Sequence, residues 1–195
     1  ISTWGRKSGS ANRSFGKPLT MATADNSLSQ YDPSQVPDGS NYRVALVVSE
    51  WNNKITEALF QGAKTTLLSH NVADNNIVRI NVPGSFELVY GASRAQQMNF
   101  NAVIAIGCVI QGETRHFEFI SNAVAQGIKD LNVNSTTPVI FCVLTDETME
   151  QSEARSGGEK GNKGVEAAVT ALRMIGLWIS FHKLSKLNGD LKHFS

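Results

Sequence analysis

Apolar and polar residues alternate along the chain in blocks, and the spacing inside each block predicts the element that it forms. Four apolar runs of strand length, rich in β-branched residues, are separated by segments whose apolar residues recur at helical spacing. We predict strands over residues 42–50, 76–82, 101–110 and 138–145. We predict helices over residues 55–67, 85–99, 120–131 and 165–179, and a short helix through Glu153 that Thr145 or Asp146 caps.

The order of these elements indicates the fold class. Strands that alternate with helices form a parallel sheet with helices on both faces. We therefore expect a three-layer α/β/α sandwich with a four-stranded parallel sheet and a flavodoxin-like, doubly wound topology, in one domain over residues 41–182. In such sheets, reactive groups gather beyond the carboxyl ends of the strands.

Both ends of the chain lack this periodicity. Residues 1–40 form an N-terminal extension that we expect to be disordered, and residues 183–195 form a tail that we expect to fray. Residues 1–20 carry four cations and no acid, which leaves the rest of the chain with a net charge of −3. Because "MATADNSLSQYD" begins at Met21 like an ordinary start of translation, we expect the first 20 residues to be a tag, an upstream start or the remnant of a transit peptide. We expect a cytoplasmic location, or a plastid location in the last case.

Composition removes several classes of function. The overall net charge of +1 does not favour a nucleic-acid partner. No apolar run approaches the ~20 residues that span a bilayer, so we expect no membrane partner. The two cysteines, Cys108 and Cys142, lie inside apolar runs and lack zinc-ligand spacing, which predicts buried free thiols of a reducing compartment and no metal site.

Known loop signatures for nucleotides, nucleophiles and metals are also missing from the segments that follow the strands. What remains is a histidine in "IQGETRHFEF", several hydroxyls and several cations. An imidazole can take and return a proton near neutral pH, and amides at a helix start can hold a phosphate. These groups suggest a cofactor-free reaction between a planar ring and a small phosphorylated molecule. The alternative is that the histidine is only a solvated polar residue.

A resemblance sharpens this hypothesis. The segments "VPGSFELVYGA", "AIGCVIQGETRHFEFISNAVAQGI", "PVIFCVLT" and "EARSGGEKGNKGVEAA" resemble successive signatures of lumazine synthase, and "VVSEWNNKIT" is similar to the family's first-strand signature. The resemblance covers about residues 41–180, in order and without large gaps. It implies a transferase that condenses 5-amino-6-(D-ribitylamino)uracil with 3,4-dihydroxy-2-butanone 4-phosphate. The products are 6,7-dimethyl-8-ribityllumazine, phosphate and water, and no cofactor is used.

The family pattern implies a role for each residue that matches it. His116 matches the proposed proton carrier. The residues that match the pyrimidine- and ribityl-binding set are Trp51, Asn52, Ser85, Phe86, Glu87, Val109, Ile110, Phe141 and Lys163. The residues that match the phosphate-binding set are Gly112, Glu113, Thr114 and Arg155. Phe141 and Lys163 match positions that the adjacent subunit supplies, so a single chain should hold only half of a site.

Some features depart from the pattern or leave alternatives open. Glu159 stands where a lysine is common, so we leave the neighbouring Lys160 out of the site. The family forms homopentamers, many of which assemble into icosahedral capsids of 60 subunits. Because "GGEKGN" shows no insertion, we expect the capsid, with riboflavin synthase as a candidate partner. The other readings are a non-catalytic relative that binds a lumazine or flavin, a structural shell and a bare flavodoxin-like domain.

Overall fold

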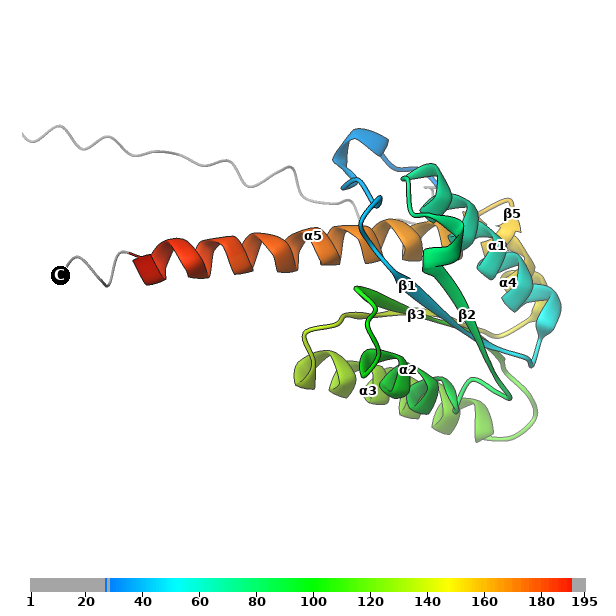
Figure 1. The fold of residues 1–195 in the computed structure, drawn as a ribbon. Helices are drawn as coiled ribbons and strands as arrows, with labels where there is room; N and C mark the ends of the chain where they lie inside the picture. The colour runs from blue at the N-terminus through cyan, green and yellow to red at the C-terminus, as the bar shows by residue number, and fades with distance from the viewer. Residues whose placement is uncertain (1–26, 28, 191–195) are drawn as a thin grey trace, which may run out of the picture.

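The computed structural model describes residues 27 and 29–190, and a four-stranded parallel sheet lies at its centre (Figure 1). The sheet contains β1 (Val44–Ser49), β2 (Ile77–Val82), β3 (Ala102–Ile110) and β4 (Val139–Asp146), in the order β2-β1-β3-β4. All four predicted strands are confirmed, although most are shorter than predicted at one or both ends. Every residue of β1 is buried, as expected for an inner strand that is covered on both faces.

Helices cover both faces of the sheet, which confirms the predicted three-layer sandwich (Figure 1). The helices α1 (Asn53–Ser69) and α5 (Lys163–Asp190) share one hydrophobic core with one face of the sheet. The helices α2 (Leu88–Gln96) and α3 (His116–Asn134) share a second core with the other face. Successive side chains of β1 alternate between these cores, because a strand has a period of two.

Several boundaries differ from the prediction. The second helix begins at Leu88 rather than Ser85. The short helix α4 (Met149–Arg155) is capped by Thr148, whose hydroxyl accepts a hydrogen bond from the Gln151 amide, because β4 extends through Asp146. Two short strands, β5 (Ser156–Gly158) and β6 (Gly161–Asn162), pair across the break before α5. The remaining elements are the short 3₁₀ helices η1 (Pro33–Gln35) and η2 (Asp74–Asn76).

The last helix does not end near residue 182 but continues to Asp190, into the segment expected to fray. Over residues 163–186 it is long and apolar enough to cross a membrane by length and composition alone, with a mean hydropathy of 1.3. The core helix of a folded domain passes the same test. The first half of α5 is such a helix, because Ala168, Ala171 and Leu172 are fully buried between α1 and the sheet.

The N-terminal extension departs from the expectation of disorder over residues 29–40. The amide of Gly39 donates to the carbonyl oxygen of His70 at 2.7 Å, and the hydroxyl of Tyr31 lies 3.2 Å from Nε2 of the same histidine. The Ser29 hydroxyl accepts a hydrogen bond from the Asn162 amide at 2.9 Å. These contacts hold the segment against the end of α1 and the loop before α5. Residues 1–26 and 28, which include the basic stretch, and residues 191–195 lie outside the described part of the chain.

Asn162 joins α1 to the start of α5. Its side-chain amide donates to the carbonyl oxygens of Ala58 and Ser156, and its side-chain oxygen accepts from the amide of Gly164. Gly164 lies so close to α1 that an added Cβ would overlap the carbonyl oxygen of Leu59. The glycine and asparagine of this loop therefore have a structural role, since they let the two helices approach.

We expect Gly164→Ala to destabilise the fold by about 2 kcal/mol or more, because the overlapping atom belongs to the backbone of a buried helix and cannot rotate away. Thermal unfolding at one fixed protein concentration measures this loss. Gly112→Ala is the matched control, since a Cβ there meets nothing within 4 Å and its φ lies outside the left-handed region. Equal melting temperatures for the two variants would contradict the packing argument.

Candidate active site

The carboxyl end of β3 extends beyond the strand beside it. The pairing of β1 with β3 ends at Val48 and Ile106, whereas the pairing of β3 with β4 continues to Ile110 and Asp146. Main-chain groups of successive strand residues point to opposite sides. The amide of Gln111 donates to Asp146 on the β4 side, so the main-chain groups of Ile110 face the side where β1 has ended. The main-chain groups of Val109 face β4. Of the two residues predicted to offer main-chain groups to a ring, only Ile110 therefore has them on the open side.

Two of the candidate residues meet at the carbonyl oxygen of Cys108, on this open side. The side-chain amide of Asn52 donates to it at 3.0 Å, and the Ser85 hydroxyl donates to it at 3.4 Å. Asn52 precedes α1 with a left-handed φ of 54° and makes no capping hydrogen bond, so its side chain is directed to β3 instead. The loops that follow β1 and β2 are thereby attached to the end of β3.

Large aromatic side chains next to these anchors are exposed. Trp51, which follows β1, is 73% exposed, and Phe86, which follows β2, is 54% exposed. Each is adjacent in sequence to an anchored residue, so its backbone is held while its ring faces outward. Glu87 is also exposed, at the start of α2. These rings offer flat apolar surfaces to a planar ligand.

The turn after β3 leads into α3. Gly112, Glu113 and Thr114 are exposed, and the Thr114 hydroxyl accepts a hydrogen bond from the amide of His116 at 3.4 Å. His116 is the first residue of α3 and is exposed. Gly112 is not explained by backbone conformation or by crowding within the chain, since its φ is not left-handed and an added Cβ would meet open space. The turn thus leaves room for another molecule beside the amides of a helix start.

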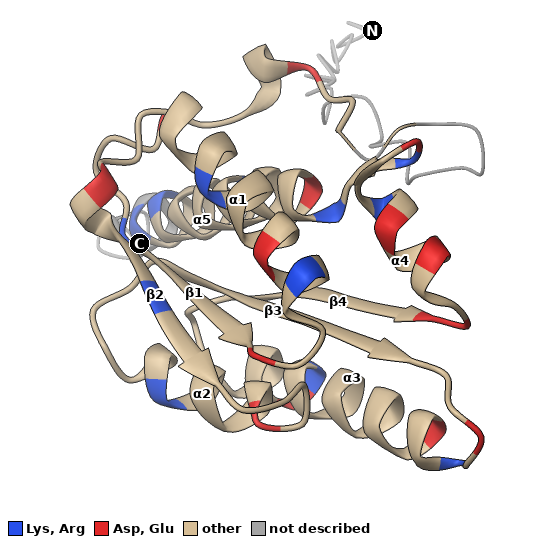
Figure 2. Cartoon of the chain, turned by 90° about the vertical axis from the view of Figure 1, so that its right-hand side faces the viewer, with Lys and Arg blue, Asp and Glu red and all other residues tan. Residues whose placement is uncertain are grey.

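Arg155, the last residue of α4, lies beside the end of β4. Its Nη1 lies 3.9 Å from Oδ1 of Asp146 and donates to the carbonyl oxygen of Gln151 at 3.0 Å. Asp146 in turn accepts a hydrogen bond from the buried Ser152 hydroxyl at 2.7 Å. Sequence reasoning missed Asp146 and Ser152 as site residues. The position of Asp146 in "LTDET", directly after a strand, was the available signal. Acidic and basic residues mix at this edge of the sheet, which faces the viewer in Figure 2.

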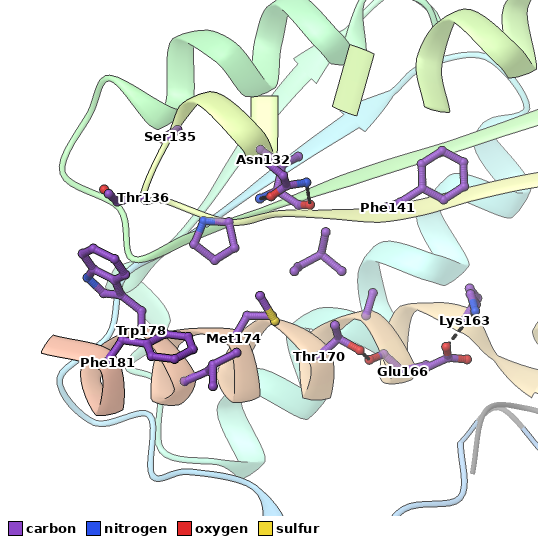
Figure 3. A pocket seen from close by; sticks show the side chains of 15 residues that line it. Asn132, Ser135, Thr136, Phe141, Lys163, Glu166, Thr170, Met174, Trp178 and Phe181 are labelled. Atoms are coloured by element: carbon purple, nitrogen blue, oxygen red, sulfur yellow. Dashed lines mark hydrogen bonds and ion pairs between the residues drawn. The ribbon is translucent and has the colours of Figure 1, made fainter. Parts of the chain in front are cut away.

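Phe141 and Lys163 do not join the other candidates within one chain. Phe141 lies opposite Ala105 in the sheet, five residues before Asp146 on the same strand, which places it about 16 Å from the strand end. Both residues instead line a groove of about 550 Å³ between β4 and α5 (Figure 3). Nζ of Lys163 pairs there with Oε1 of Glu166 at 2.8 Å.

This groove is mostly apolar and open. Besides the Lys163–Glu166 pair, its lining includes Met174, Leu177, Trp178 and Phe181 of α5, which are 38–56% exposed. The groove lies away from the strand ends where the polar candidates gather. An apolar, open lining of this kind suits a protein surface better than a small phosphorylated ligand.

The two cysteines are free and buried, as predicted. Burial raises the pKa of the Cys142 thiol to about 12, and it also raises the pKa of the Cys108 thiol. A thiol that stays protonated near neutral pH is a poor nucleophile. Among residues 27 and 29–190, no group of three or more His, Cys, Asp or Glu side chains is placed to bind a metal.

The fold and this arrangement define a class of protein, namely a flavodoxin-like α/β protein with a candidate ligand site at the carboxyl edge of its parallel sheet. Comparison with known proteins narrows the class. The sequence model of the 6,7-dimethyl-8-ribityllumazine synthase family matches residues 41–178. The chain belongs to this family and is therefore an enzyme, a transferase of riboflavin biosynthesis.

Individual relatives support this assignment along most of their length. The chain is 57% identical to a 6,7-dimethyl-8-ribityllumazine synthase from Christiangramia forsetii over 156 residues, which are 79% of this chain and 93% of the relative. It is 56% identical to the enzyme of the same name from Flavobacterium johnsoniae over 155 residues, 79% of this chain and 82% of the relative. The corresponding figures for the Porphyromonas gingivalis enzyme are 55% over 158 residues, 80% and 98%.

We expect Asn52→Ala to destabilise the protein by about 2 kcal/mol, because alanine is strained in the left-handed region and cannot donate to Cys108. Asn52→Gly should cost about half as much, since glycine accepts the backbone conformation and loses only the hydrogen bond. Urea denaturation measures both values, with Asn53→Ala in the first turn of α1 as the control. If the alanine and glycine variants were equally stable, the left-handed backbone conformation at position 52 would cost alanine no more than glycine, which would contradict the strain argument.

Proposed function

We propose that the groups at the carboxyl edge of the sheet carry out the family's reaction. That reaction condenses 5-amino-6-(D-ribitylamino)uracil with 3,4-dihydroxy-2-butanone 4-phosphate to give 6,7-dimethyl-8-ribityllumazine, phosphate and water, the penultimate step of riboflavin biosynthesis. The observation that carries the proposal is the overhang of β3, with Trp51 on one side and the turn after β3 on the other. With this arrangement, a flat ligand can bind beside Trp51 and a phosphate can bind at the nearby turn.

The pyrimidine takes the place that a longer β1 would occupy. Its ring edge meets the main-chain groups of Ile110, and its face stacks on Trp51. Asn52 and Ser85 hold the surrounding loops through the Cys108 carbonyl. The ribityl chain then extends along Ser85, Phe86 and Glu87, where a carboxylate and main-chain groups can bind its hydroxyls. Val109 supports the site indirectly, through its pairing with β4 and the packing of its side chain on the core that α2 and α3 share.

The phosphate binds between the first turn of α3 and Arg155. Amides of Gly112, Glu113 and Thr114 and the Thr114 hydroxyl supply neutral donors, and the guanidinium supplies the opposite charge. The open space at Gly112 supports this placement, because a glycine that the backbone does not require leaves room for an approaching anion. His116 lies at the boundary between the two ligands.

The residues match the steps of the reaction. The amine of the pyrimidine attacks the ketone, and one water is expelled to form an imine. A proton is lost from the neighbouring carbon and phosphate departs with the electron pair of its C–O bond, which leaves an enol that tautomerises to a second ketone. The ribitylamino nitrogen attacks this ketone and closes the ring with loss of a second water, so that the condensation releases one phosphate and two waters. His116 carries protons between these steps. Both substrates are reactive, so positioning supplies much of the acceleration.

Assembly completes the site. Phe141 and Lys163 match ligand-binding positions, yet one chain keeps them apart from the strand ends, so we assign them to the site of a neighbouring copy. The exposed apolar groove along α5 supports such an interface. We propose a homopentamer, and a 60-subunit shell because residues 156–162 form a tight hairpin without an insertion. We place this assembly in the cytoplasm.

We expect His116→Ala to reduce turnover by about 10²-fold or more without abolishing it, because positioning of the substrates remains. Arg155→Ala should cost more in kcat/KM, since the phosphate loses its charged partner. Lumazine formation, followed by absorbance and fluorescence after mixing the two substrates, measures both effects. Arg94→Ala, an exposed arginine on α2, is the control. A His116 variant with the unsubstituted enzyme's rate in single-turnover experiments would remove the proton-carrier role.

We expect Leu177→Asp to dissociate the assembly, because it places a charge in the apolar groove. Activity should fall with it, because Phe141 and Lys163 of the neighbouring copy then no longer complete the site. Leu177 is 45% exposed, so the substitution spares the core of its own chain. Multi-angle light scattering gives the mass of both variants. Met98→Asp, at an exposed apolar residue outside the groove, is the control. A Leu177 variant of unchanged mass would show that the groove is not the interface.

A further inference from the structure

Asp146 connects the two parts of the candidate phosphate site. Its main-chain oxygen accepts a hydrogen bond from the Gln111 amide at 3.0 Å, directly before the turn at Gly112. Its side chain faces α4, where Oδ1 lies 3.9 Å from Nη1 of Arg155. The Asp146 side chain is only 12% exposed, whereas that of Arg155 is 40% exposed. One residue at the end of β4 thus contacts both the turn and the arginine.

Ser152 fixes the orientation of the Asp146 carboxylate. The serine is fully buried, and its hydroxyl donates to Oδ2 of Asp146 at 2.7 Å. The same hydroxyl lies 3.4 Å from Sγ of Cys108 on β3. Ser152 and Arg155 are three residues apart on α4, so they lie on the same face of the helix. The hydrogen bond therefore sets the rotation of α4 at which Arg155 faces Asp146.

We propose that Asp146 and Ser152 form a positioning pair that aims the Arg155 guanidinium at the phosphate of the substrate. The proposal rests on the proposed function, because it requires that Arg155 binds that phosphate. Neither residue touches the substrate in this account, and both act through Arg155. Neither the sequence pattern nor the family resemblance assigned these residues to the substrate site.

The geometry suits a residue that orients the Arg155 side chain but leaves most of its N–H groups available for a ligand. Asp146 and the Gln151 carbonyl both engage Nη1, and the described residues show no hydrogen bond from Nε or Nη2. Those two nitrogens are free to make a bidentate contact with a phosphate. At 3.9 Å the ion pair is too long for a hydrogen bond, so Asp146 attracts the guanidinium without occupying its N–H groups.

The alternative is that the pair only anchors α4 to the sheet. Asp146→Asn separates these roles, because asparagine still accepts the Ser152 hydrogen bond but removes the charge beside Arg155. If the pair positions Arg155, the KM for the phosphorylated ketone rises about tenfold, and the KM for the pyrimidine changes by less than about twofold. The inhibition constant of inorganic phosphate rises in parallel. Ser152→Ala moves the same constants in the same direction, and Ser152→Thr, which keeps the hydroxyl, restores them.

The experiment uses steady-state kinetics of the full chain, with both substrates varied. Glu153→Gln is the matched control, since this acid lies on the same helix and pairs with Lys54 instead. In an Arg155→Ala background, Asp146→Asn should add less than about twofold, because a residue that acts through Arg155 has no effect once the arginine is gone. If Asp146→Asn does not fold, the alanine and threonine variants of Ser152 decide the question by the same constants.

Three results would overturn the proposal. The first is an unchanged or lower KM for the phosphorylated ketone in Asp146→Asn while Arg155→Ala raises it. The second is an equal rise in the KM of both substrates, which would indicate a merely structural role. The third is full additivity of the two substitutions. If Arg155→Ala itself left the KM for the phosphorylated ketone unchanged, the phosphate role of Arg155 would fail, and that failure is separate from the one tested here.

Discussion

The site depends on the unequal length of two neighbouring strands. β3 pairs with β4 over its whole carboxyl half, but β1 stops at the level of Ile106. A backbone that loses its strand partner needs other hydrogen-bonding groups. Asn52 and Ser85 satisfy the Cys108 carbonyl, and the next open group, at Ile110, is the one that the proposed function assigns to the pyrimidine. The proposed binding of a flat ring would thus follow from the same hydrogen-bonding requirement that holds the sheet together.

A few part-buried hydrogen bonds hold the surrounding loops. Asn162 joins α1 to α5, and the Ser152 hydroxyl joins α4 to the end of β4. Hydrogen bonds within a buried setting favour one arrangement strongly, because every alternative leaves a polar group unpaired. These contacts connect the elements that carry the candidate binding groups.

The last helix has two apolar faces with different roles. Leu172 and Ile175 are buried in the core of the domain, whereas Leu177 and Trp178 remain exposed beside β4. Exposed apolar residues outside the core-facing stripe of a helix indicate a second contact surface. Phe141 and Lys163 lie along that surface. In the proposed assembly, this one helix would therefore link folding of the chain to completion of the site.

The chain's own pattern determined the four strands, the main helices and the three layers, because alternation of period two and spacing near 3.6 are local properties that core burial selects. Successive family motifs also identified the segments at the carboxyl edge. Local pattern could not reveal that Thr148 rather than Asp146 caps α4, that residues 29–40 pack on His70, or that α5 continues to Asp190. Nor could it reveal that Asp146 links Gln111 to Arg155, or that Phe141 lies far from the strand ends. The end of β4 sets where α4 can begin, and the contacts of His70, Gln111 and Arg155 join residues distant in sequence or in different elements. Only the tertiary structure decides these features, because a contact between residues far apart in the sequence cannot be inferred from either segment alone.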